Sequence, residues 1–340
     1  VYTNRPVFEN GGHISVRAGS FDMYGAEGVY NAALGDNSAL RFAAQYNTNE
    51  GYAEYAPTGQ GLEGGTQWGA RAQYLTEMGD WSFLAGVDYS DEDMNGHARI
   101  PVTTAATNPI FTGIVNGLRT GLDIRQSFSS PDNYQTRTNY GVTFRAEHEG
   151  QNFDFVSLTS YRNNDYAWRD NLGGLPFPGF PLAVDDRAAE ASDQISQEFR
   201  LVSPDSSTVQ WVAGVYLFQE NVDRSERFIV QSALPIAPAS FGGDVTFLQD
   251  ATNTSYALFG QMTVPFADIW EFTAGARWSH DEREIHQVAV DNDTLGPLPP
   301  GIPLGPTGTP YNVNADDTFE EPTWRLALSV EPVDHARFYI

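Results

Sequence analysis

Apolar and polar side chains alternate along most of this chain with a period of two residues. The stretch WEFTAGARWS (270–279) puts Trp, Phe, Ala, Ala and Trp on one parity and Glu, Thr, Gly, Arg and Ser on the other. Such a period indicates a β-strand whose two faces meet different surroundings. Helical periodicity is convincing nowhere, so we expect an all-β protein.

The alternation predicts thirteen strands, of which 24–34 and 153–163 have no cleanly apolar parity. Their expected limits are 12–20, 24–34, 39–48, 67–76, 80–90, 139–147, 153–163, 193–203, 208–220, 252–264, 269–280, 322–331 and 335–340. After residue 279 the chain turns acidic, and there we expect the strand to end and an external loop to begin.

The connections between these strands differ in length. Short turns rich in Gly, Pro, Asp or Asn alternate with five long connections at 49–66, 91–138, 164–192, 221–251 and 281–321. Structureless loops of that length are uncommon in compact domains, and here they all fall at one end of an up-and-down antiparallel sheet. Short turns at one rim and long loops at the other are typical of outer-membrane β-barrels.

Strand length and aromatic placement also favour a membrane barrel. The predicted strands run to about 9–12 residues, against about 5–6 in globular proteins, and about 9–11 tilted residues cross a bilayer. Trp270 and Trp278 on one apolar parity are about 26 Å apart along the strand, or about 19 Å in depth after tilting. The aromatics expected at the membrane interfaces are Trp68, Tyr74, Trp81, Tyr89, Trp270, Trp278 and Trp324.

The opposite parity carries charge in mid-strand, which is expensive in hydrocarbon and therefore must face water or a carboxylate. A soluble sandwich with polar faces outward would also satisfy these residues, but it would not explain the long strands and loops. We expect the following residues to face the lumen, as candidates for contact with a plug inside it: Arg41, Arg71, Arg145, Glu147, Glu198, Arg200, Glu271, Arg277 and Arg325.

Composition further narrows the classes of protein to which the chain could belong. The net charge is −25, and all 19 basic residues are Arg, so the chain cannot neutralise a nucleic-acid backbone. The absence of cysteine excludes disulfides and thiolate metal sites. No apolar run approaches the about 18 residues of a membrane helix. We expect neither a metal nor a cofactor, and no motif of a hydrolase or phosphate-binding loop is present.

Five segments resemble the barrel strands of TonB-dependent outer-membrane receptors. They are ISVRAGSFDMYGAEGVYNAALGDNSALRFAAQYNTNEGY (14–52), SQEFRLVSP (196–204), TSYALFGQMTVPF (254–266), IWEFTAGARWSHDERE (269–284) and PTWRLALSVEPVDHARFYI (322–340). The resemblance implies a transmembrane barrel of about 22 strands around an N-terminal plug, with TonB as the periplasmic partner. Because no plug or TonB box is visible, we expect residues 1–340 to be part of the barrel domain, in the outer membrane of a Gram-negative bacterium and surrounded by its lipid.

For such a receptor the long loops are expected to recognise a small-molecule ligand, since binding residues often lie on loops of rigid scaffolds. An iron chelate such as a ferric siderophore is the expected ligand, and binding and gating rather than catalysis the expected chemistry. The aromatic and arginine candidates are Tyr52, Tyr55, Arg162, Tyr166, Trp168, Arg169, Phe177 and Phe180. Two other functions remain open, a passive porin or structural barrel and a soluble glycan-binding β protein.

Overall fold

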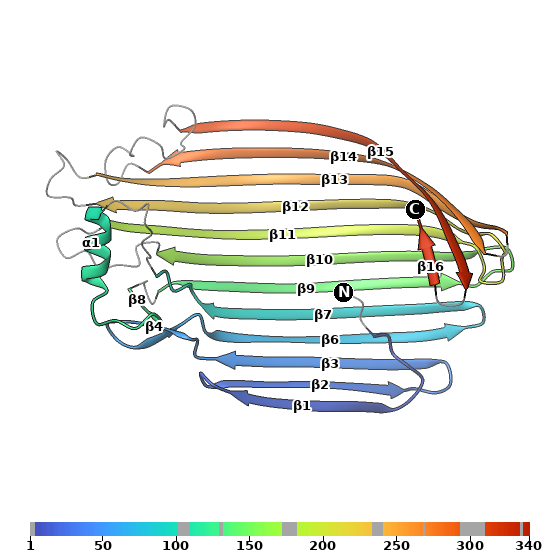
Figure 1. Ribbon diagram of the computed structural model, residues 1–340, viewed down its shortest axis with the longest axis horizontal. Helices are drawn as coiled ribbons and strands as arrows, with labels where there is room; N and C mark the ends of the chain where they lie inside the picture. Colours follow the sequence, from blue (N-terminus) through green and yellow to red (C-terminus); the bar gives the residue numbers. More distant parts are fainter. Residues whose placement is uncertain are drawn as a thin grey trace.

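The computed structural model describes residues 4–100, 109–128, 132–171, 182–232, 241–267, 269–292, 310–333 and 336–340. Within them, thirteen strands form one antiparallel sheet in which each strand pairs with its neighbours along the chain (Figure 1). They are β1 (Gly11–Gly19), β2 (Met23–Ala33), β3 (Ser38–Asn49), β6 (Gly65–Met78), β7 (Trp81–Asn95), β9 (Tyr134–His148), β10 (Asp154–Asn171), β11 (Leu182–Val202), β12 (Gln210–Ser232), β13 (Phe241–Ala267), β14 (Trp270–Asp291), β15 (Tyr311–Val333) and β16 (Ala336–Tyr339). The predicted all-β, up-and-down antiparallel architecture is confirmed.

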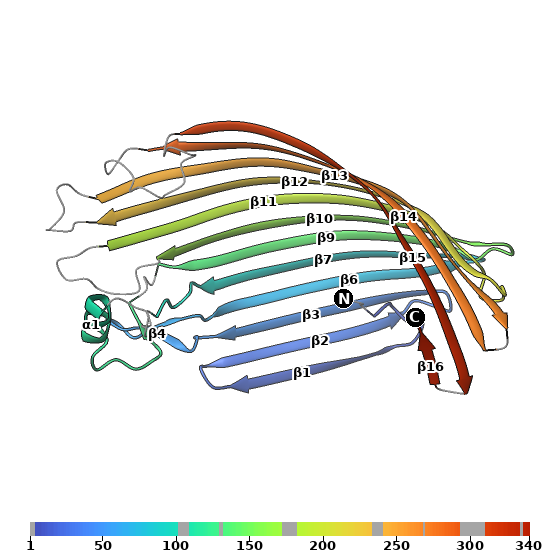
Figure 2. The same cartoon turned by 45° about the horizontal axis from the view of Figure 1, so that its top comes forward.

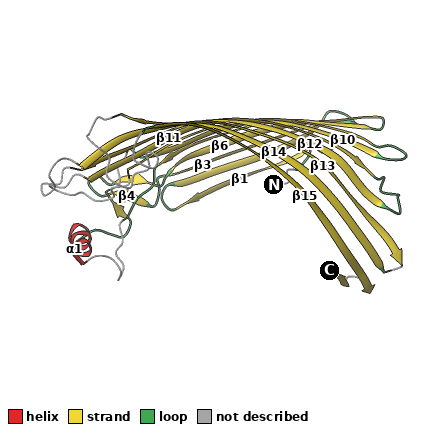
Figure 3. Cartoon of the chain, turned by 90° about the horizontal axis from the view of Figure 1, so that it is seen from above, coloured by secondary structure: helices red, strands yellow, loops and turns green. Residues whose placement is uncertain are grey.

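The sheet is strongly curved and open. Figures 2 and 3 show an arch with a convex and a concave face, and its outermost strands, β1 and β16, each pair on one side only in the described residues. The curvature follows from the twist that strands impose on a large antiparallel sheet.

Short and long connections lie at opposite ends of the strands, as the sequence predicts. The turns β2–β3, β6–β7 and β9–β10 lie at one end, which we call the turn end (Figure 1). The other is the loop end, where the β1–β2 hairpin is a short exception. Its central residues Phe21 and Asp22 have positive φ angles of 62° and 48°, as a tight hairpin with matching twist requires.

Three of the five predicted loops are mostly strand, and here the sequence prediction was wrong. β10 continues to Asn171 where a loop was expected from 164, and β14 continues to Asp291 where the strand was expected to end near 280. The ladder between β12 and β13 likewise continues to the pair Ser232–Phe241. In these extensions both faces mix polar and apolar residues: Val245 and Ala289 are buried against Phe228 on one face, while Leu248 and Val290 lie exposed on the other. Regular alternation is therefore lost, whereas backbone pairing does not need it.

The connection 96–133 contains a helix that periodicity did not predict, α1 (Pro109–Leu118). It begins with proline, which is favoured at the first helical position. The same end holds a small sheet of β4 (Ala53–Tyr55), β5 (Gln60–Leu62) and β8 (Gln126–Ser127), which joins the connection 50–64 to 96–133. Among the described residues, no helix has the length and apolarity needed to cross a membrane.

The two faces of the arch carry the two parities. The register aligns Arg71, Asp88, Gly141 and Arg162 in one row across β6, β7, β9 and β10, on the polar face. All nine residues expected to face the lumen have this parity. This polar face is the concave one, since residues 4–10 lie on it beneath the arch (Figure 3).

The convex face is apolar between two aromatic rows. The loop-side aromatic row comprises Trp68, Tyr89, Tyr140, Tyr161, Tyr256 and Trp278, and the turn-side aromatic row comprises Trp81, Phe83, Phe155, Phe199, Phe266 and Trp270. Neighbouring rings within a row are close, with centroids 5.0 Å apart for Trp68–Tyr89 and 6.3 Å for Phe266–Trp270. Beyond the loop-side row the convex face becomes polar, with Asn163, Asp193, Asn221, Thr252 and Glu284 in one register row.

The N-terminal segment is fastened to the concave face. The buried amide of Asn31 accepts a hydrogen bond from the Val7 backbone N–H at 2.9 Å and donates to the carbonyls of Val7 and Glu9. The guanidinium of Arg5 donates to Glu147 near the turn end of β9, also at 2.9 Å. The chain before β1 therefore runs along the inside of the arch.

Candidate functional site

A pocket of about 220 Å³ lies at the loop end of the concave face. β10 supplies Tyr166, Trp168 and Asp170, because alternate residues of this strand point to the concave side. Its lining also includes Gly96, His97, Arg99, Tyr134, Gln135 and Arg169. The strand extension of β10 and the start of the connection 96–133 thus form the site together, and we call it the rim pocket.

A buried ion pair fixes the wall of the rim pocket. Asp170 is 3% exposed and accepts a hydrogen bond from Arg99 Nε at 2.8 Å. Its second oxygen accepts from Asn133 Nδ2 at 3.2 Å, and Asn133 in turn accepts from the Asn171 backbone N–H at 2.8 Å. These bonds hold the connection 96–133 against β10, so the pocket is a built feature of the fold.

Aromatic and cationic groups face each other in and beside the pocket. The guanidinium of Arg137 lies 4.6 Å from the centroid of the Tyr166 ring. At the pocket mouth, His97 Nδ1 lies 3.6 Å from a carboxylate oxygen of Glu63. Planar guanidinium groups and aromatic faces bind anionic and π-rich molecules, so this side of the pocket suits an anionic or aromatic ligand.

Carboxylates extend from the rim pocket along the concave face. Asp186 is directly opposite Asp170 in the β10–β11 register, and one of its oxygens is buried without a hydrogen-bond partner. Burial, followed by repulsion from Glu226 and Asp170, raises the pKa of Asp186 to about 6. Arg224 bridges the neighbouring carboxylates at 3.2 Å from Glu190 and 2.7 Å from Glu226. These bonds also raise the pKa of the Arg224 guanidinium.

The structure brings together only some of the predicted ligand residues. Tyr166, Trp168 and Arg169 line the rim pocket, but they lie in a strand and not in a loop, and Arg169 Nε is paired with Asp185 at 2.7 Å. Arg162 is also in β10, deeper on the concave face, where it bonds Asp88 at 3.1 Å.

The other predicted ligand residues lie elsewhere. Tyr52 and Tyr55 belong to the connection 50–64, away from the pocket lining. Phe177 and Phe180 fall outside the described residues.

Sequence reasoning missed Arg99, Arg137 and Asp170. Asp170 and Arg137 could have been found by continuing the alternation of their strands past the point where the convex parity becomes polar. Arg99 could not, because its contact with Asp170 joins residues 71 positions apart in a connection without a periodic pattern.

Below the rim pocket, the predicted lumen-facing charges form ion pairs along the concave face. Asp88 lies between Arg71 and Arg162, at 3.5 and 3.1 Å, and Glu198 lies 3.0 Å from Arg200. Arg145 pairs with Glu147. Arg277 lies over the Phe259 ring, and Arg41, Glu271 and Arg325 share the face by register. No group of three or more possible metal-ligating side chains is found in the described part of the chain.

The sequence and the fold of this chain are both similar to those of known proteins. Residues 95–340 match the family model "TonB dependent receptor-like, beta-barrel". A sequence search of curated proteins finds no match.

Among solved structures, the chain is similar to the ferric-catecholate import receptor Fiu of E. coli in its open form. The TM-score is 0.73 at 13% identity, covering 99% of this chain and 54% of that one. The siderophore receptor PiuA of Acinetobacter baumannii gives a TM-score of 0.72 at 14% identity, covering 99% and 49%. The ferric yersiniabactin uptake receptor FyuA of Yersinia pestis gives 0.70 at 16% identity, covering 99% and 47%.

At these identities the likeness shows a shared fold, and the chain spans about half the length of the proteins it resembles. The family match covers most of the chain, and its strands, faces and connections agree with it. This chain therefore belongs to the TonB-dependent receptor β-barrel family, whose members are transport receptors of the Gram-negative outer membrane.

Proposed function

We propose that this chain is part of an outer-membrane receptor that imports a ferric siderophore or a similar iron chelate with energy delivered by TonB. The observation that carries the proposal is the rim pocket, which combines Trp168, Tyr166 and Arg99 at the loop end of the concave face. Three similar structures, Fiu, PiuA and FyuA, are receptors for ferric chelates or siderophores by their names.

The chemistry of the rim pocket suits capture without catalysis. Many ferric chelates are anionic and carry aromatic or conjugated iron-binding groups, which stack on rings and accept hydrogen bonds from guanidinium groups. Trp168 supplies a large rigid surface, while Arg137 lies over Tyr166 and reinforces the cationic side. A ligand held there would lie at the entrance to the concave interior.

The concave face is also suited to holding a plug. Residues 4–10 already run along it, and the ion pairs at Glu147, Glu198 and Arg200 line the same side near the turn end. We include in the proposal that residues 1–340 are part of a barrel whose plug domain contacts these charges, and that TonB acts on the plug.

The test is uptake of radioactive ferric iron by cells whose only siderophore receptor is the full-length protein. Ferric catecholate, hydroxamate and carboxylate siderophores are supplied in turn. Uptake of at least one is expected, with loss on deleting TonB or collapsing the proton gradient. Trp168→Ala should lower that uptake about tenfold or more, since one stacked aromatic in a binding site contributes about 1–3 kcal/mol.

Leu248→Ala is the matched control, because Leu248 lies on the convex side of β13, next to the register row of Trp168 but three strands away, and is 42% exposed. Its uptake should equal that of the unchanged receptor. Equal uptake by the Trp168→Ala and Leu248→Ala variants would remove the rim pocket from the proposal. A properly assembled receptor that imports none of the three chelates would contradict the proposed ligand class.

A further inference from the structure

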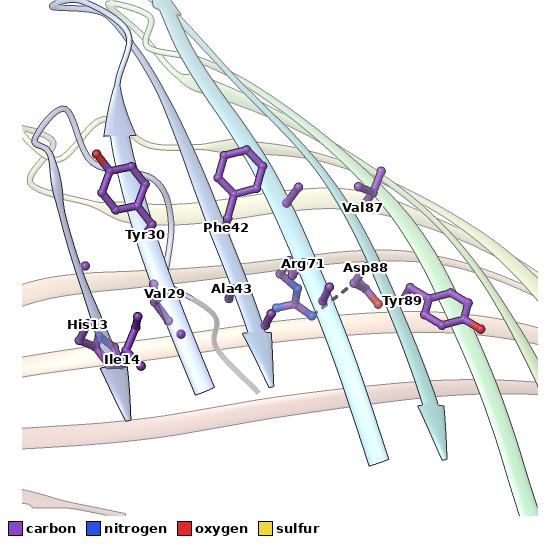
Figure 4. Close-up of a pocket in the computed structure, with 15 residues that line it drawn as sticks. His13, Ile14, Val29, Tyr30, Phe42, Ala43, Arg71, Val87, Asp88 and Tyr89 are labelled. Atoms are coloured by element: carbon purple, nitrogen blue, oxygen red, sulfur yellow. Dashed lines mark ion pairs between the residues drawn. The ribbon is translucent and has the colours of Figure 1, made fainter. Parts of the chain in front are cut away.

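The convex face of β1, β2, β3, β6 and β7 carries an apolar hollow of about 900 Å³. Figure 4 shows Tyr30 and Phe42 side by side on β2 and β3, with Val87 and Tyr89 on β7 across the intervening strand. The hollow lies over the middle of these strands, and at β7 it reaches the loop-side aromatic row at Tyr89.

Short side chains make the floor of the hollow. The register places Gly28, Ala44 and Ala70 in one continuous row across β2, β3 and β6, with Ile14 at one end and Tyr89 at the other. The lining also includes Tyr30 and Phe42 in the next row, with the small residue Ala72 between Phe42 and Val87, so the hollow is a channel over small residues beside these two rings.

The hollow presents no charge to the convex side among the residues that line it. His13, Arg71 and Asp88 are also in the lining, but they have the concave parity, and Arg71 pairs with Asp88 at 3.5 Å across that face (Figure 4). Their backbones contribute to the floor while their charged groups lie on the opposite side of the sheet. An occupant of the convex hollow would therefore be uncharged and apolar along its length.

The position of the hollow identifies its surroundings. Trp68 and Tyr89, 5.0 Å apart, belong to the loop-side aromatic row, and Trp81 on β7 belongs to the turn-side row. Such rows mark the two interfaces of a bilayer, so the space between them is filled by hydrocarbon. The occupant must then come from within the membrane.

We propose that this hollow is a binding site for one acyl chain of an outer-membrane lipid, held longer than the chains over the rest of the convex face. A flexible hydrocarbon chain fits a narrow channel that crosses tilted strands, and it fills the space that Gly28, Ala44 and Ala70 leave open. A second copy of the protein suits it less well, since a stable protein interface needs a broad complementary area of about 800 Å² on each partner. The inference rests on the proposed membrane location of the convex face.

The experiment uses the full-length receptor in outer-membrane vesicles that contain lipids with a photoactivatable group on the acyl chain. After illumination, mass spectrometry maps the crosslinked peptides. Crosslinks to the peptides containing Gly28, Ala44 and Ala70 should exceed those to peptides of β13 and β14 on the same apolar band by about fivefold. The double variant Ala44→Leu, Ala70→Leu should fill the channel. Crosslinking of these peptides should then equal that of the β13 and β14 peptides.

Ala276→Leu is the control, because Ala276 lies on the convex parity of β14 outside the hollow. It should leave the excess unchanged. Uniform crosslinking over the whole convex face, with or without the filled channel, would overturn the acyl-chain site while leaving the membrane location intact. Crosslinking to a second receptor molecule at this place would replace the acyl chain by a protein partner. No lipid crosslinks to the convex face at all would contradict the proposed membrane location itself.

Discussion

At the scale of single residues, Asn31 shows how one side chain positions a whole segment. It is 3% exposed, and its amide satisfies one N–H and two carbonyl groups of the chain that precedes β1. No aliphatic residue could do this, and aspartate would lack the two donors. The path of residues 4–10 along the concave face therefore depends on a side chain in the neighbouring strand.

Asn31→Ala should release the N-terminal segment without unfolding the sheet. Leaving buried polar backbone groups unpaired costs about 1–3 kcal/mol, so the Val7 amide should exchange its hydrogen about tenfold faster or more. Hydrogen exchange followed by mass spectrometry measures this rate. The control is Thr76→Ala, which removes a side-chain hydroxyl from β6. Unchanged protection at Val7 would show that other contacts hold the segment, such as Arg5 with Glu147 and the hydrogen bond that Asn10 accepts from the Ala33 backbone N–H at 2.9 Å.

Asp186 gives the rim a pH dependence. Its pKa is raised to about 6 in the fold, above its ordinary value, so the ionised form is disfavoured by folding. The sign follows from this shift: the contribution of Asp186 to the stability of the rim is fully present below about pH 4 and is lost as the pH rises through about 6. Removing the charge at neutral pH should therefore stabilise the rim.

Asp186→Asn should slow hydrogen exchange of the amides around 182–190 above pH 6, by about fivefold. This corresponds to about 1 kcal/mol after solvent screening is allowed for. Near pH 4 the variant and the parent should exchange alike. Asp205→Asn in the exposed turn before β12 should show no such effect. If Asp186→Asn slowed exchange equally at both pH values, the stabilisation would come from the shape of the new side chain and not from removal of the charge.

At the scale of elements, the strands are longer than a membrane requires. β12 has 23 residues and β13 has 27, and both pair continuously beyond the loop-side aromatic row. About 9–11 tilted residues cross a bilayer, so roughly half of each strand extends outside it. These extensions form a rigid wall on which the rim pocket is built, where the sequence suggested loops.

Ser225→Pro tests the extension of β12. Ser225 pairs with Ala189 on one side and Leu248 on the other, so it is in the interior of the sheet. Proline removes a ladder hydrogen bond and is tolerated only at strand edges, so amides of 219–232 should exchange at least tenfold faster. Ser225→Thr, a β-forming substitution at the same site, should exchange like the parent. If 221–251 were a loop, both variants would behave alike.

The part of the sheet between the two aromatic rows could be predicted from the sequence, and the strand extensions at the loop end could not. Between the aromatic rows most strands have one apolar and one polar face, so the faces of Phe272 and Arg277 can be predicted directly from the alternation. Just beyond Trp278 the charged run His280–Glu284 breaks the alternation, and Ile285, Val288 and Ala289 follow without a regular period, so the pairing that continues to Ala289 and Tyr311 was not predicted. For the same reason only part of the rim pocket was predicted. Trp168 was predicted as a ligand residue because it is an aromatic residue near arginines. Arg99 and Asp170 were missed, because they are brought together only by the folded structure.

At the scale of the whole molecule, the arch is held together differently from a soluble domain. Large apolar residues such as Leu326 at 59% and Trp324 at 76% are exposed on the convex face, while charged residues occupy the concave one. A water-soluble protein would bury the first set and expose the second, so this distribution is reversed relative to a soluble domain. This distribution supports the proposed location, in which hydrocarbon covers the convex side.

The two faces can be distinguished by introduced thiols, because residues 1–340 contain no cysteine of their own; any cysteine elsewhere in the full-length receptor is first replaced by serine. Phe272→Cys and Leu326→Cys place a thiol on the convex face, and Arg277→Cys and Arg325→Cys place one on the concave face; Leu326 and Arg325 are the depth-matched pair. In the full-length receptor in membranes, a maleimide dissolved in the lipid should modify the first pair at least tenfold faster than the second. A plug inside the barrel would block water-borne reagents on the concave side, so the lipid-borne reagent is the informative one. Faster modification at 277 and 325 than at 272 and 326 would reverse the assignment of the faces, and with it the proposed position of the rim pocket on an interior wall.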